Sequence, residues 1–304
     1  MEECIKNGYK IFGCSYDNKK EYARSFVVAT ISELDQFYGS KYFQSYTVDG
    51  FTEILKDKTN QKYAIFGTPC QIYAFTQTAA YKRSPEKYFM VDIFCHGCPS
   101  MKLWESYLSY VKLKTSCENF DGIAFRSKIH GWHEYSFEFY KNDEKYVSNK
   151  HRDLFYEIFF SMDIMNEACY DCNSRSTMGY GDIRLGDFWG QQYDTDTKGV
   201  SAVILKTTKG AEIFNAIKDK LHVEDTTLEQ ILLSQSYGKK HVFNQTRRDF
   251  LLSKLKGNAD LKAIADEYRK MFPIKKRMKS TFKSLIKYFP TNIFLYIKKL
   301  AHSI

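Results

Sequence analysis

The stretch Lys62-Tyr63-Ala64-Ile65-Phe66-Gly67-Thr68-Pro69-Cys70-Gln71 contains a short apolar run, a glycine turn and the start of a helix. The same order returns in Tyr88–Phe94, followed by Cys95-His96-Gly97-Cys98-Pro99-Ser100 and an amphipathic run over Met101–Lys114. A repeated order of strand, glycine turn and helix is typical of α/β folds with a parallel sheet. Because ligands bind where the carboxyl ends of parallel strands meet, we expect Cys70 and Cys95 at one edge of one sheet.

Hydrophobic periodicity and turn residues predict further elements on both sides of these two units. Further strands are expected at Tyr9–Tyr16, Ala23–Ala29, Ile123–Arg126, Glu134–Tyr140, Asp182–Phe188 and Val200–Thr207. Further helices are expected after an N-cap at Ser32, and at Phe51–Lys58, Gln71–Tyr81, Asp153–Met162, Gly210–Lys220, Leu228–Ser236, Phe243–Leu255 and Ala259–Phe272. The predicted fold class is α/β (mixed α+β), with a mostly parallel central sheet, an antiparallel portion and a helical C-terminal part. We expect one domain over residues 1–272 and a basic tail over 273–304.

Composition and charge limit the class of protein. The chain has 304 residues, of which 43% are hydrophobic and 27% charged, as in ordinary globular proteins. Its net charge is +9, and residues 274–304 supply eight Lys or Arg and no acid, so the remainder carries about +1 (9 − 8). A nearly neutral body does not indicate nucleic-acid binding. The acidic start Met1-Glu2-Glu3 is unlike a signal peptide, and no apolar run predicts a membrane span. We expect a cytoplasmic protein.

The basic tail has two interpretations. Phe282, Leu285, Ile286 and Phe289 alternate with lysines in a pattern that predicts an amphipathic helix. Such a helix binds an anionic membrane surface through its basic and apolar residues, which would place the protein at the inner face of the membrane. The alternative is a C-terminal helix that packs on the body and exposes its lysines.

Five of the eight cysteines form a pattern. Cys95 and Cys98 form one Cys-x-x-Cys pair, Cys169 and Cys172 form another, and Cys70 lies in a glycine turn. In a reducing compartment such cysteines more often bind metal or do redox chemistry than form disulfides. Spacing leaves four alternatives open: an iron–sulfur cluster with thiolates from separated segments, a structural zinc ion, a redox dithiol, or small buried side chains. The last of these is the interpretation for Cys4, Cys14 and Cys117.

Two other kinds of site receive little support. Cys70 or Cys98 could pair with His96 as nucleophile and base, but no third residue that would orient the base is evident. The chain has no Gly-x-Gly-x-x-Gly or Walker sequence. The turns at Gly67 and Gly97 could direct backbone N–H groups at a phosphate or could be routine turns.

Five motifs follow one another in the chain and carry a resemblance. They are Gly39-Ser40-Lys41-Tyr42-x-Gln44-Ser45, Gly67-Thr68-Pro69-Cys70-Gln71, Asp92-Ile93-Phe94-Cys95-His96-Gly97-x-Pro99-Ser100, Phe125-Arg126 with Gly131-Trp132, and Cys169-Tyr170-x-Cys172 followed by Gly181-Asp182-Ile183-x-Leu185-Gly186-Asp187-Phe188-Trp189-Gly190. Together they resemble the beta subunits of coenzyme F420 hydrogenases and dehydrogenases, over the region from Tyr9 to Phe214.

The resemblance implies a flavoprotein oxidoreductase that contains FAD and iron–sulfur clusters. It would pass electrons between a 4Fe–4S cluster, FAD and a hydride-accepting substrate, which is a deazaflavin in some relatives. Many bacterial relatives occur with glycan-assembly genes, which implies a glycan-related substrate and a role in surface polysaccharide biosynthesis. The implied cluster ligands are Cys70, Cys95, Cys169 and Cys172. The implied flavin-binding residues are Ser40, Lys41, Tyr42, Gln44, Gly67, Thr68, His96, Gly97 and Arg126, and no catalytic residue is implied.

The sequence also departs from the family pattern. An N-terminal ferredoxin-like module and a Ser-Gly-Gly turn that holds the flavin have no counterpart, so a separate ferredoxin-like carrier or partner subunit is expected and FAD binding is in doubt. Position 98, usually apolar, is Cys98, a spare candidate ligand. Position 184, usually a small hydroxyl residue, is Arg184. A second hypothesis is therefore a non-catalytic scaffold with zinc or an empty cysteine site.

Overall fold

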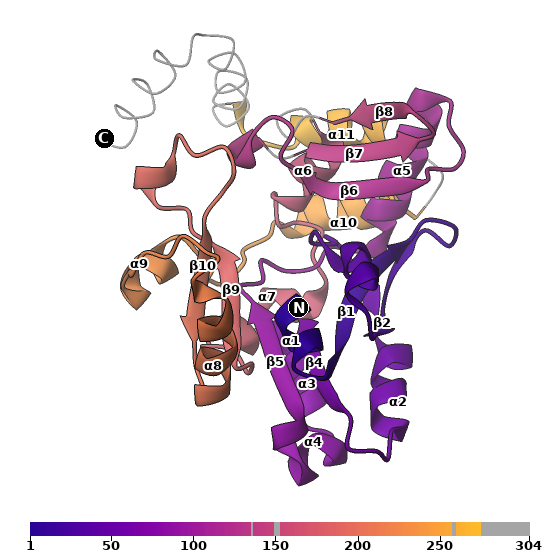
Figure 1. The fold of residues 1–304 in the computed structure, drawn as a ribbon. Coiled ribbons are helices and arrows are strands. Elements are labelled where there is room, and N and C mark those ends of the chain that lie inside the picture. Colours follow the sequence, from indigo (N-terminus) through magenta and orange to yellow (C-terminus); the bar gives the residue numbers. More distant parts are fainter. Residues whose placement is uncertain (135, 149–152, 257–259, 275–304) are drawn as a thin grey trace.

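The larger of two sheets dominates the structure. The computed structural model describes residues 1–134, 136–148, 153–256 and 260–274. In these residues seven strands form one sheet in the order β10-β9-β5-β4-β1-β2-β3 (Figure 1). They are β1 (Tyr9–Asp17), β2 (Tyr22–Val28), β3 (Ser45–Tyr46), β4 (Lys62–Gly67), β5 (Tyr88–Ile93), β9 (Ile183–Asp187) and β10 (Ser201–Leu205). Strands β1, β4, β5 and β9 are mutually parallel, and β2 and β10 pair antiparallel with β1 and β9.

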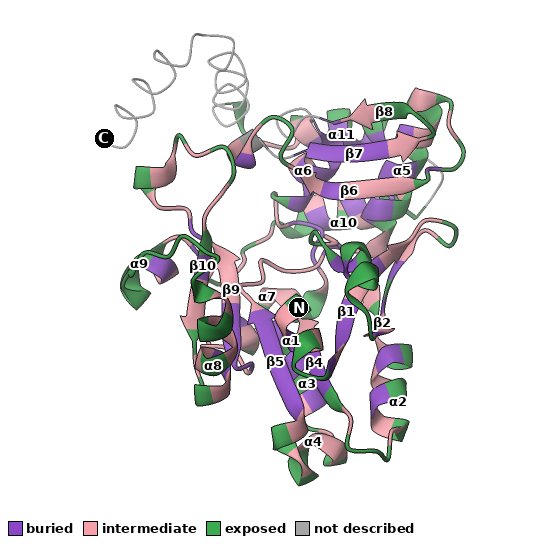
Figure 2. Cartoon of the chain, viewed as in Figure 1, coloured by how far each residue is buried: buried purple, intermediate pink, exposed green. Residues whose placement is uncertain are grey.

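Helices cover both faces of this sheet. Helix α1 (Glu2–Lys6), the 3₁₀ helix η1 (Ile31–Phe37) and α8 (Thr208–Lys218) pack on one face, and α2 (Val48–Lys56), α3 (Pro69–Thr76) and α4 (Ala79–Arg83) pack on the other. Ile11 and Phe12, neighbours in β1, belong to opposite cores and are at most 1% exposed. Successive strand side chains point to opposite faces, so a strand that is buried on both faces is mostly apolar, as Tyr88–Val91 of β5 are, and Figure 2 shows β5 as buried.

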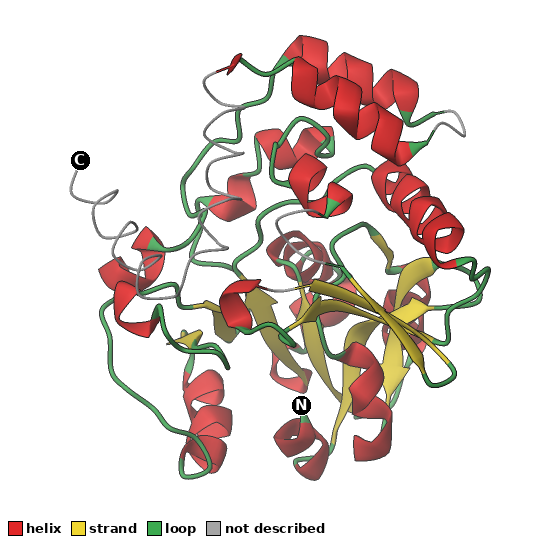
Figure 3. Ribbon diagram, turned by 90° about the horizontal axis from the view of Figure 1, so that it is seen from above, coloured by secondary structure: helices red, strands yellow, loops and turns green. Residues whose placement is uncertain are grey.

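A second, antiparallel sheet consists of β6 (Gly122–Ser127), β7 (Ser136–Lys141) and β8 (Glu144–Val147). It shares one aromatic core with α5 (Met101–Thr115), α6 (Leu154–Phe159), α10 (Gln245–Lys254) and α11 (Leu261–Lys270). Trp104 of α5 is fully buried there and contacts Phe125, Phe137 and Phe155. The view from above shows this helical layer beside the sheets (Figure 3). The short elements are α7 (Glu167–Tyr170), α9 (Leu228–Leu233), η2 (Pro85–Lys87), η3 (Trp132–Glu134), η4 (Asn173–Arg175) and η5 (Gln191–Tyr193).

The predicted fold class is confirmed: a mostly parallel central sheet, an antiparallel portion and a helical C-terminal part are all present. The expected parallel pairing of the two strand–turn–helix units is also present, because Gly67 of β4 pairs with Asp92 of β5.

Several local predictions were wrong. The N-cap is Thr30, not Ser32, because Thr30 and Glu33 form a capping box and η1 begins at Ile31. The expected helix Gln71–Tyr81 is two helices, since the Thr78 hydroxyl accepts a hydrogen bond from the Tyr81 N–H and starts α4. Strand β8 was not predicted, although Asn142 has the positive φ of 52° that a tight β7–β8 hairpin favours.

The structure tests neither of the two predictions for the C-terminus. The tail over 275–304, and with it the expected membrane-binding helix, lies outside the described residues. The boundary near Phe272 stays a prediction. Every helix in the described part of the chain is too short or too polar to serve as a transmembrane span.

Candidate functional site

Cys70 lies where β4 ends and α3 begins. Thr68 is the N-cap of α3 and forms a capping box with Gln71, whose Oε1 accepts the Thr68 N–H at 2.9 Å. Pro69 occupies the first helical position, where its missing N–H has no cost. The Thr68 hydroxyl lies 3.1 Å from Cys70 Sγ, and the cysteine is exposed. A local capping signal thus holds an accessible thiol at the carboxyl edge of the sheet.

Strand β5 brings Cys95 to the same edge, since β4 and β5 are parallel neighbours. The loop after β5 turns at Gly97, whose φ of 128° lies in the region that only glycine adopts without strain. The side chain of Ser100 then caps α5. The strand end, the glycine and the cap together fix the positions of Cys95 and Cys98.

The third segment, which carries Cys169 and Cys172, packs directly on this loop. The Cys98 N–H donates a hydrogen bond to Cys169 Sγ at 3.4 Å, and the Asn166 N–H donates to the Cys98 carbonyl at 2.8 Å. A Cβ added at Gly97 would lie 3.6 Å from the Cβ of Cys169. Two loops that are far apart in the sequence therefore form one compact unit.

The four implied ligands share one electrostatic environment. Burial, with smaller contributions from Cys70, Cys169 and Cys172, raises the pKa of the Cys95 thiol to about 12. Burial also raises the pKa of Cys98 to about 12, and raises the pKa of Cys169. Thiols with such pKa values are protonated at neutral pH, so a bound metal or cluster must displace protons. Four thiolates gathered from three segments are the donor set that an iron–sulfur cluster takes.

The remaining cysteines have ordinary surroundings. Cys4 is 1% exposed in the core of the larger sheet. Cys117 follows α5 and donates to the Asn119 carbonyl at 3.3 Å. Over the described ranges, no group of three or more His, Cys, Asp or Glu side chains, the four implied cysteines included, is arranged so that it could hold a metal ion.

A buried ion pair lies beside Cys95. Arg184 of β9 and Asp92 of β5 are 1% and 0% exposed, and Arg184 Nε lies 3.3 Å from Asp92 Oδ1. The other carboxylate oxygen accepts the backbone N–H groups of Tyr180 at 2.6 Å and Gly181 at 3.0 Å. Burial lowers the pKa of Arg184, and interactions with Asp92 and Cys95 oppose this shift. The pair thus joins the two strands and the loop between Cys172 and β9.

Arg175 is a second buried cation at the site. It is 7% exposed and donates to the backbone carbonyls of Cys169 and Lys239, the latter at 3.0 Å. Burial first, and then the charges of His241 and Arg175, lower the pKa of His96 to about 4, so its imidazole is neutral at pH 7.

His96 belongs to a row of rings that continues to the turn around Tyr42. His96 Nδ1 lies 2.9 Å from Ser236 Oγ, while Nε2 is buried without a hydrogen-bond partner. Its ring centroid lies 5.7 Å from that of Phe159, which lies 5.7 Å from that of Tyr42. His241 Nε2 donates to the His96 carbonyl at 2.5 Å. An unpaired buried nitrogen beside flat apolar rings fits an aromatic ligand with polar ring atoms.

Arg126 lies at the far end of the same region. Its guanidinium is ion-paired with Asp187 at the end of β9 and stacks over Trp189 at 5.3 Å. Trp189 in turn stacks on Trp132, with centroids 4.4 Å apart and planes inclined by 7°. Burial raises the pKa of Tyr42, and the charges of Arg126 and Asp187 also act on it. Tyr42 and Arg126, which lie far apart in the sequence, are thus neighbours.

The turn over Gly39–Gln44 is held by its own lysine. Lys41 Nζ donates to the carbonyls of Cys14 at 2.9 Å and Tyr38 at 3.0 Å, and to two others at 3.3 Å. Burial lowers the pKa of Lys41 to about 8. Its ammonium therefore stabilises the turn. Ser40 and Gln44 are exposed.

The structure brings some of the implied site residues together and leaves others apart. The cysteines Cys70, Cys95, Cys169 and Cys172 share one environment. Tyr42, His96 and Arg126 lie along one row of aromatic side chains. Gly67 ends β4, Thr68 forms the capping box of α3 with Gln71, and Gln71 donates to Ser45 Oγ at 3.0 Å. Ser40, Lys41 and Gln44 contribute a turn rather than side chains that converge on the site.

Comparison with known proteins identifies the family. Residues 60–230, which are more than half of the chain, match the family described as the C terminus of the coenzyme F420 hydrogenase/dehydrogenase beta subunit. The chain belongs to this family. The match includes all four implied cysteines and ends before α10 and α11.

A solved structure also resembles this family member. A chain of the F420-reducing [NiFe] hydrogenase complex from Methanosarcina barkeri, studied by xenon derivatization, is 17% identical, with a TM-score of 0.49. The similarity covers 90% of this chain and 85% of that one. A search of curated proteins found no match.

Several residues of this F420 beta-subunit family member were not predicted from the sequence as part of the site. Asp187 and Trp189 lie in a quoted motif, but their contacts with Arg126 depend on the position of β6 relative to β9. Arg175, Ser236 and His241 belong to loops with no distinctive pattern. Arg184 differs from the family pattern, which gives no hint of its partner, Asp92, on another strand.

Proposed function

We propose that this chain is an iron–sulfur flavoprotein oxidoreductase. Membership of the F420 hydrogenase/dehydrogenase beta-subunit family supports redox chemistry in general. The observations that carry the proposal further are geometric: the parallel pairing of β4 and β5 puts Cys70 and Cys95 at one carboxyl edge of the sheet, and the hydrogen bond from the Cys98 N–H to Cys169 Sγ brings the second Cys-x-x-Cys pair against the loop that follows β5.

In this proposal the four cysteines hold a 4Fe–4S cluster, which takes up and releases single electrons. The chain supplies the surroundings of the thiolates. Cys70 is exposed, so one side of the site is open to an electron carrier. Arg175 and Arg184 lie on the inner side, where their buried positive charges offset the negative charge of four thiolates.

We place FAD along the row from His96 to Arg126. Bound there, it would exchange hydride with a substrate and single electrons with a cluster. His96 offers an unpaired ring nitrogen, Gly97 lets the backbone approach closely, and the rings of Tyr42 and Phe159 form the apolar part of the row. Arg126, held by Asp187 and Trp189, places a positive charge near the ring or a phosphate.

The proposed partners follow from this arrangement. A ferredoxin-like carrier or partner subunit would exchange electrons at the Cys70 side. The hydride-accepting substrate would be a deazaflavin or a glycan-related molecule, the latter in surface polysaccharide biosynthesis. Both substrate classes come from the resemblance.

Visible spectroscopy of protein purified without oxygen tests the proposal. We expect the absorption bands of an oxidised flavin and a broad cluster absorption that fades on reduction with dithionite. The control is the same protein after denaturation and removal of cofactors. A colourless protein with one zinc ion per chain would instead support the scaffold hypothesis. A cluster without flavin would restrict the function to electron transfer.

The basic tail over 273–304 gives a separate prediction. We propose that it attaches the protein to anionic membranes, on the strength of its eight basic residues and alternating apolar residues. Vesicles with anionic lipid should sediment with the full chain and not with a chain that ends at Pro273. Equal sedimentation of both proteins would contradict this, and vesicles of neutral lipid are the control.

A further inference from the structure

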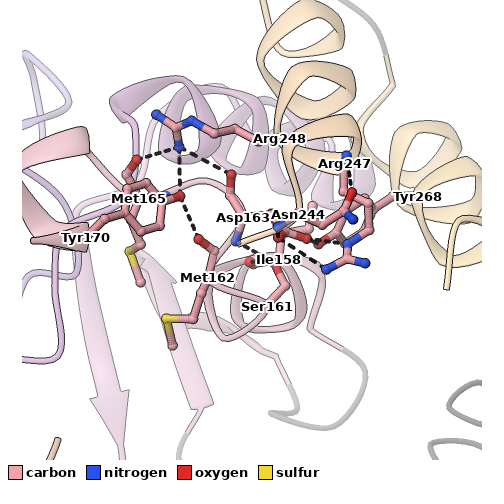
Figure 4. A network of polar contacts seen from close by, with 10 residues as sticks. All are labelled: Ile158, Ser161, Met162, Asp163, Met165, Tyr170, Asn244, Arg247, Arg248 and Tyr268. Carbon is pink, nitrogen blue, oxygen red and sulfur yellow. Dashed lines mark hydrogen bonds and ion pairs between the residues drawn. The ribbon is translucent and has the colours of Figure 1, made fainter. Parts of the chain in front are cut away.

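Helix α10 contacts the segment that carries Cys169 and Cys172 through a buried arginine. Arg248 of α10 is 7% exposed and donates from one guanidinium nitrogen to the Met165 carbonyl at 2.8 Å and to Tyr170 Oη at 2.7 Å. The same nitrogen lies 3.3 Å from the Asp163 carbonyl. Figure 4 shows these bonds converging on the loop that precedes α7. The family match ends at residue 230, so the helix lies beyond it.

The Tyr170 hydroxyl is the centre of this network. It accepts from Arg248 and from the Met165 N–H at 3.1 Å, and it donates to the Met162 carbonyl at 2.7 Å. A phenol has one donor and two acceptor sites, so its capacity is fully used. The Tyr170 ring lies 5.0 Å from the Arg248 guanidinium and 4.2 Å, between centroids, from Phe243, and the guanidinium also lies 5.4 Å from the Phe243 ring. Since Tyr170 stands directly after Cys169, these contacts fix the backbone of the Cys-x-x-Cys pair.

A second set of bonds anchors the same loop to α10 and α11. Asp163 is fully buried, and its carboxylate accepts from Arg247 Nε at 2.5 Å, Tyr268 Oη at 2.5 Å and the Asn244 N–H at 2.8 Å. Asn244 is itself the N-cap of α10. Charge-assisted hydrogen bonds of this kind are about twice as strong as neutral ones.

The anchored loop also holds the other ligand segment. The backbone of Met165 forms an isolated bridge with that of Pro99, and the Asn166 N–H donates to the Cys98 carbonyl. The hydrogen bonds of α10 thus reach both Cys-x-x-Cys pairs through one loop of five residues, 162–166.

We propose that α10 is a clamp that forms the Cys169–Cys172 side of the site before any metal is bound, and that Arg248 is its positioning residue. The role of the clamp in cluster binding depends on the proposed function, whereas the preformed loop does not. Without Arg248, Tyr170 and Met165 lose their common partner, so the loop opens while the sheets and the aromatic core keep their contacts.

Thiol reactivity in the metal-free protein tests the clamp. In Arg248→Met, the alkylation rates of Cys169 and Cys172 by iodoacetamide should rise about tenfold or more, as loss of a charged hydrogen bond implies. Two cysteines serve as internal references: Cys70 is exposed, and Cys4 lies in a core and reacts only when the whole domain opens. Neither rate should change. Peptide mass spectrometry measures all four rates in one sample.

Three further variants make the result decisive. Tyr170→Phe removes the central hydroxyl but keeps the ring, so it should raise the same two rates and should not add to the effect of Arg248→Met. It also decides the matter if Arg248→Met does not fold. Arg248→Lys should restore part of the protection. Lys254→Met, an exposed position on the same helix paired with Glu267 at 3.7 Å, is the matched control.

The outcomes separate the clamp from the proposed function. Unchanged Cys169 and Cys172 rates in both Arg248→Met and Tyr170→Phe, or an equal rise at Cys4, would overturn the clamp. After reconstitution with iron and sulfide, Arg248→Met should also lose iron to a chelator faster than the unsubstituted protein does. If neither the unsubstituted protein nor any variant takes up iron, the proposed function fails. The thiol rates still decide whether the clamp exists.

Discussion

Replacing Cys95 with alanine should reduce the iron content of the protein from about four atoms per chain to near zero. Cys95 lies just after β5, and the thiols of Cys70, Cys169 and Cys172 add to the effect of burial in raising its pKa. A cluster bound by three thiolates exposes one iron to solvent and is readily lost. Iron and acid-labile sulfide, measured after purification without oxygen, report this directly.

Cys98 is a fifth thiol near the implied ligands, so it needs its own variants. Cys98 lies in the same loop, and Cys95 contributes to the raised pKa of its thiol, so Cys98 is the thiol that would hold any iron that Cys95→Ala retains. We therefore expect Cys98→Ala to keep its iron and the double variant Cys95→Ala/Cys98→Ala to have none. Cys117→Ser, at the end of α5, is the matched control and should keep all its iron. Full iron content in the double variant would exclude Cys95 as a ligand.

The second large effect concerns stability. Asp92→Ala should lower the free energy of unfolding by about 3–5 kcal/mol, because it leaves the buried guanidinium of Arg184 without its carboxylate. The backbone N–H groups of Tyr180 and Gly181 lose their acceptor as well. Urea unfolding of the metal-free protein measures this loss without interference from cofactors.

Two comparisons identify the cause of that loss. Glu105→Ala breaks an exposed pair with Lys102 and should cost less than about 1 kcal/mol. The double variant Asp92→Leu/Arg184→Met removes both charges and should recover much of the stability. Equal losses for Asp92→Ala and Glu105→Ala would show that the buried pair contributes little.

The parts of the fold that the sequence predicted are those with local signals. An apolar run, a glycine turn and a capped helix are each determined by neighbouring residues, and parallel strands place their carboxyl ends together. The positions of Cys70 and Cys95 at one edge could therefore be predicted. The missed hairpin at Asn142 also has a local signal in the sequence, because asparagine is favoured where a tight turn between two strands requires a positive φ.

Contacts between polar side chains on distant segments could not be predicted. Arg184 and Asp92 come from strands about 90 residues apart that became neighbours only in the folded sheet. Arg248 and Tyr170 lie on helices with no shared motif. Lys41 belongs to a motif that the resemblance connects with flavin, yet its ammonium stabilises the turn through four backbone carbonyls. The identity of a side chain does not reveal its partner.

The most direct test of the central claim is diffraction from crystals grown without oxygen, measured on both sides of the iron absorption edge. We predict anomalous scattering from a 4Fe–4S cluster that lies between Cys70, Cys95, Cys169 and Cys172. No iron signal at this place, or a single zinc ion bound to the two Cys-x-x-Cys pairs, would contradict the account.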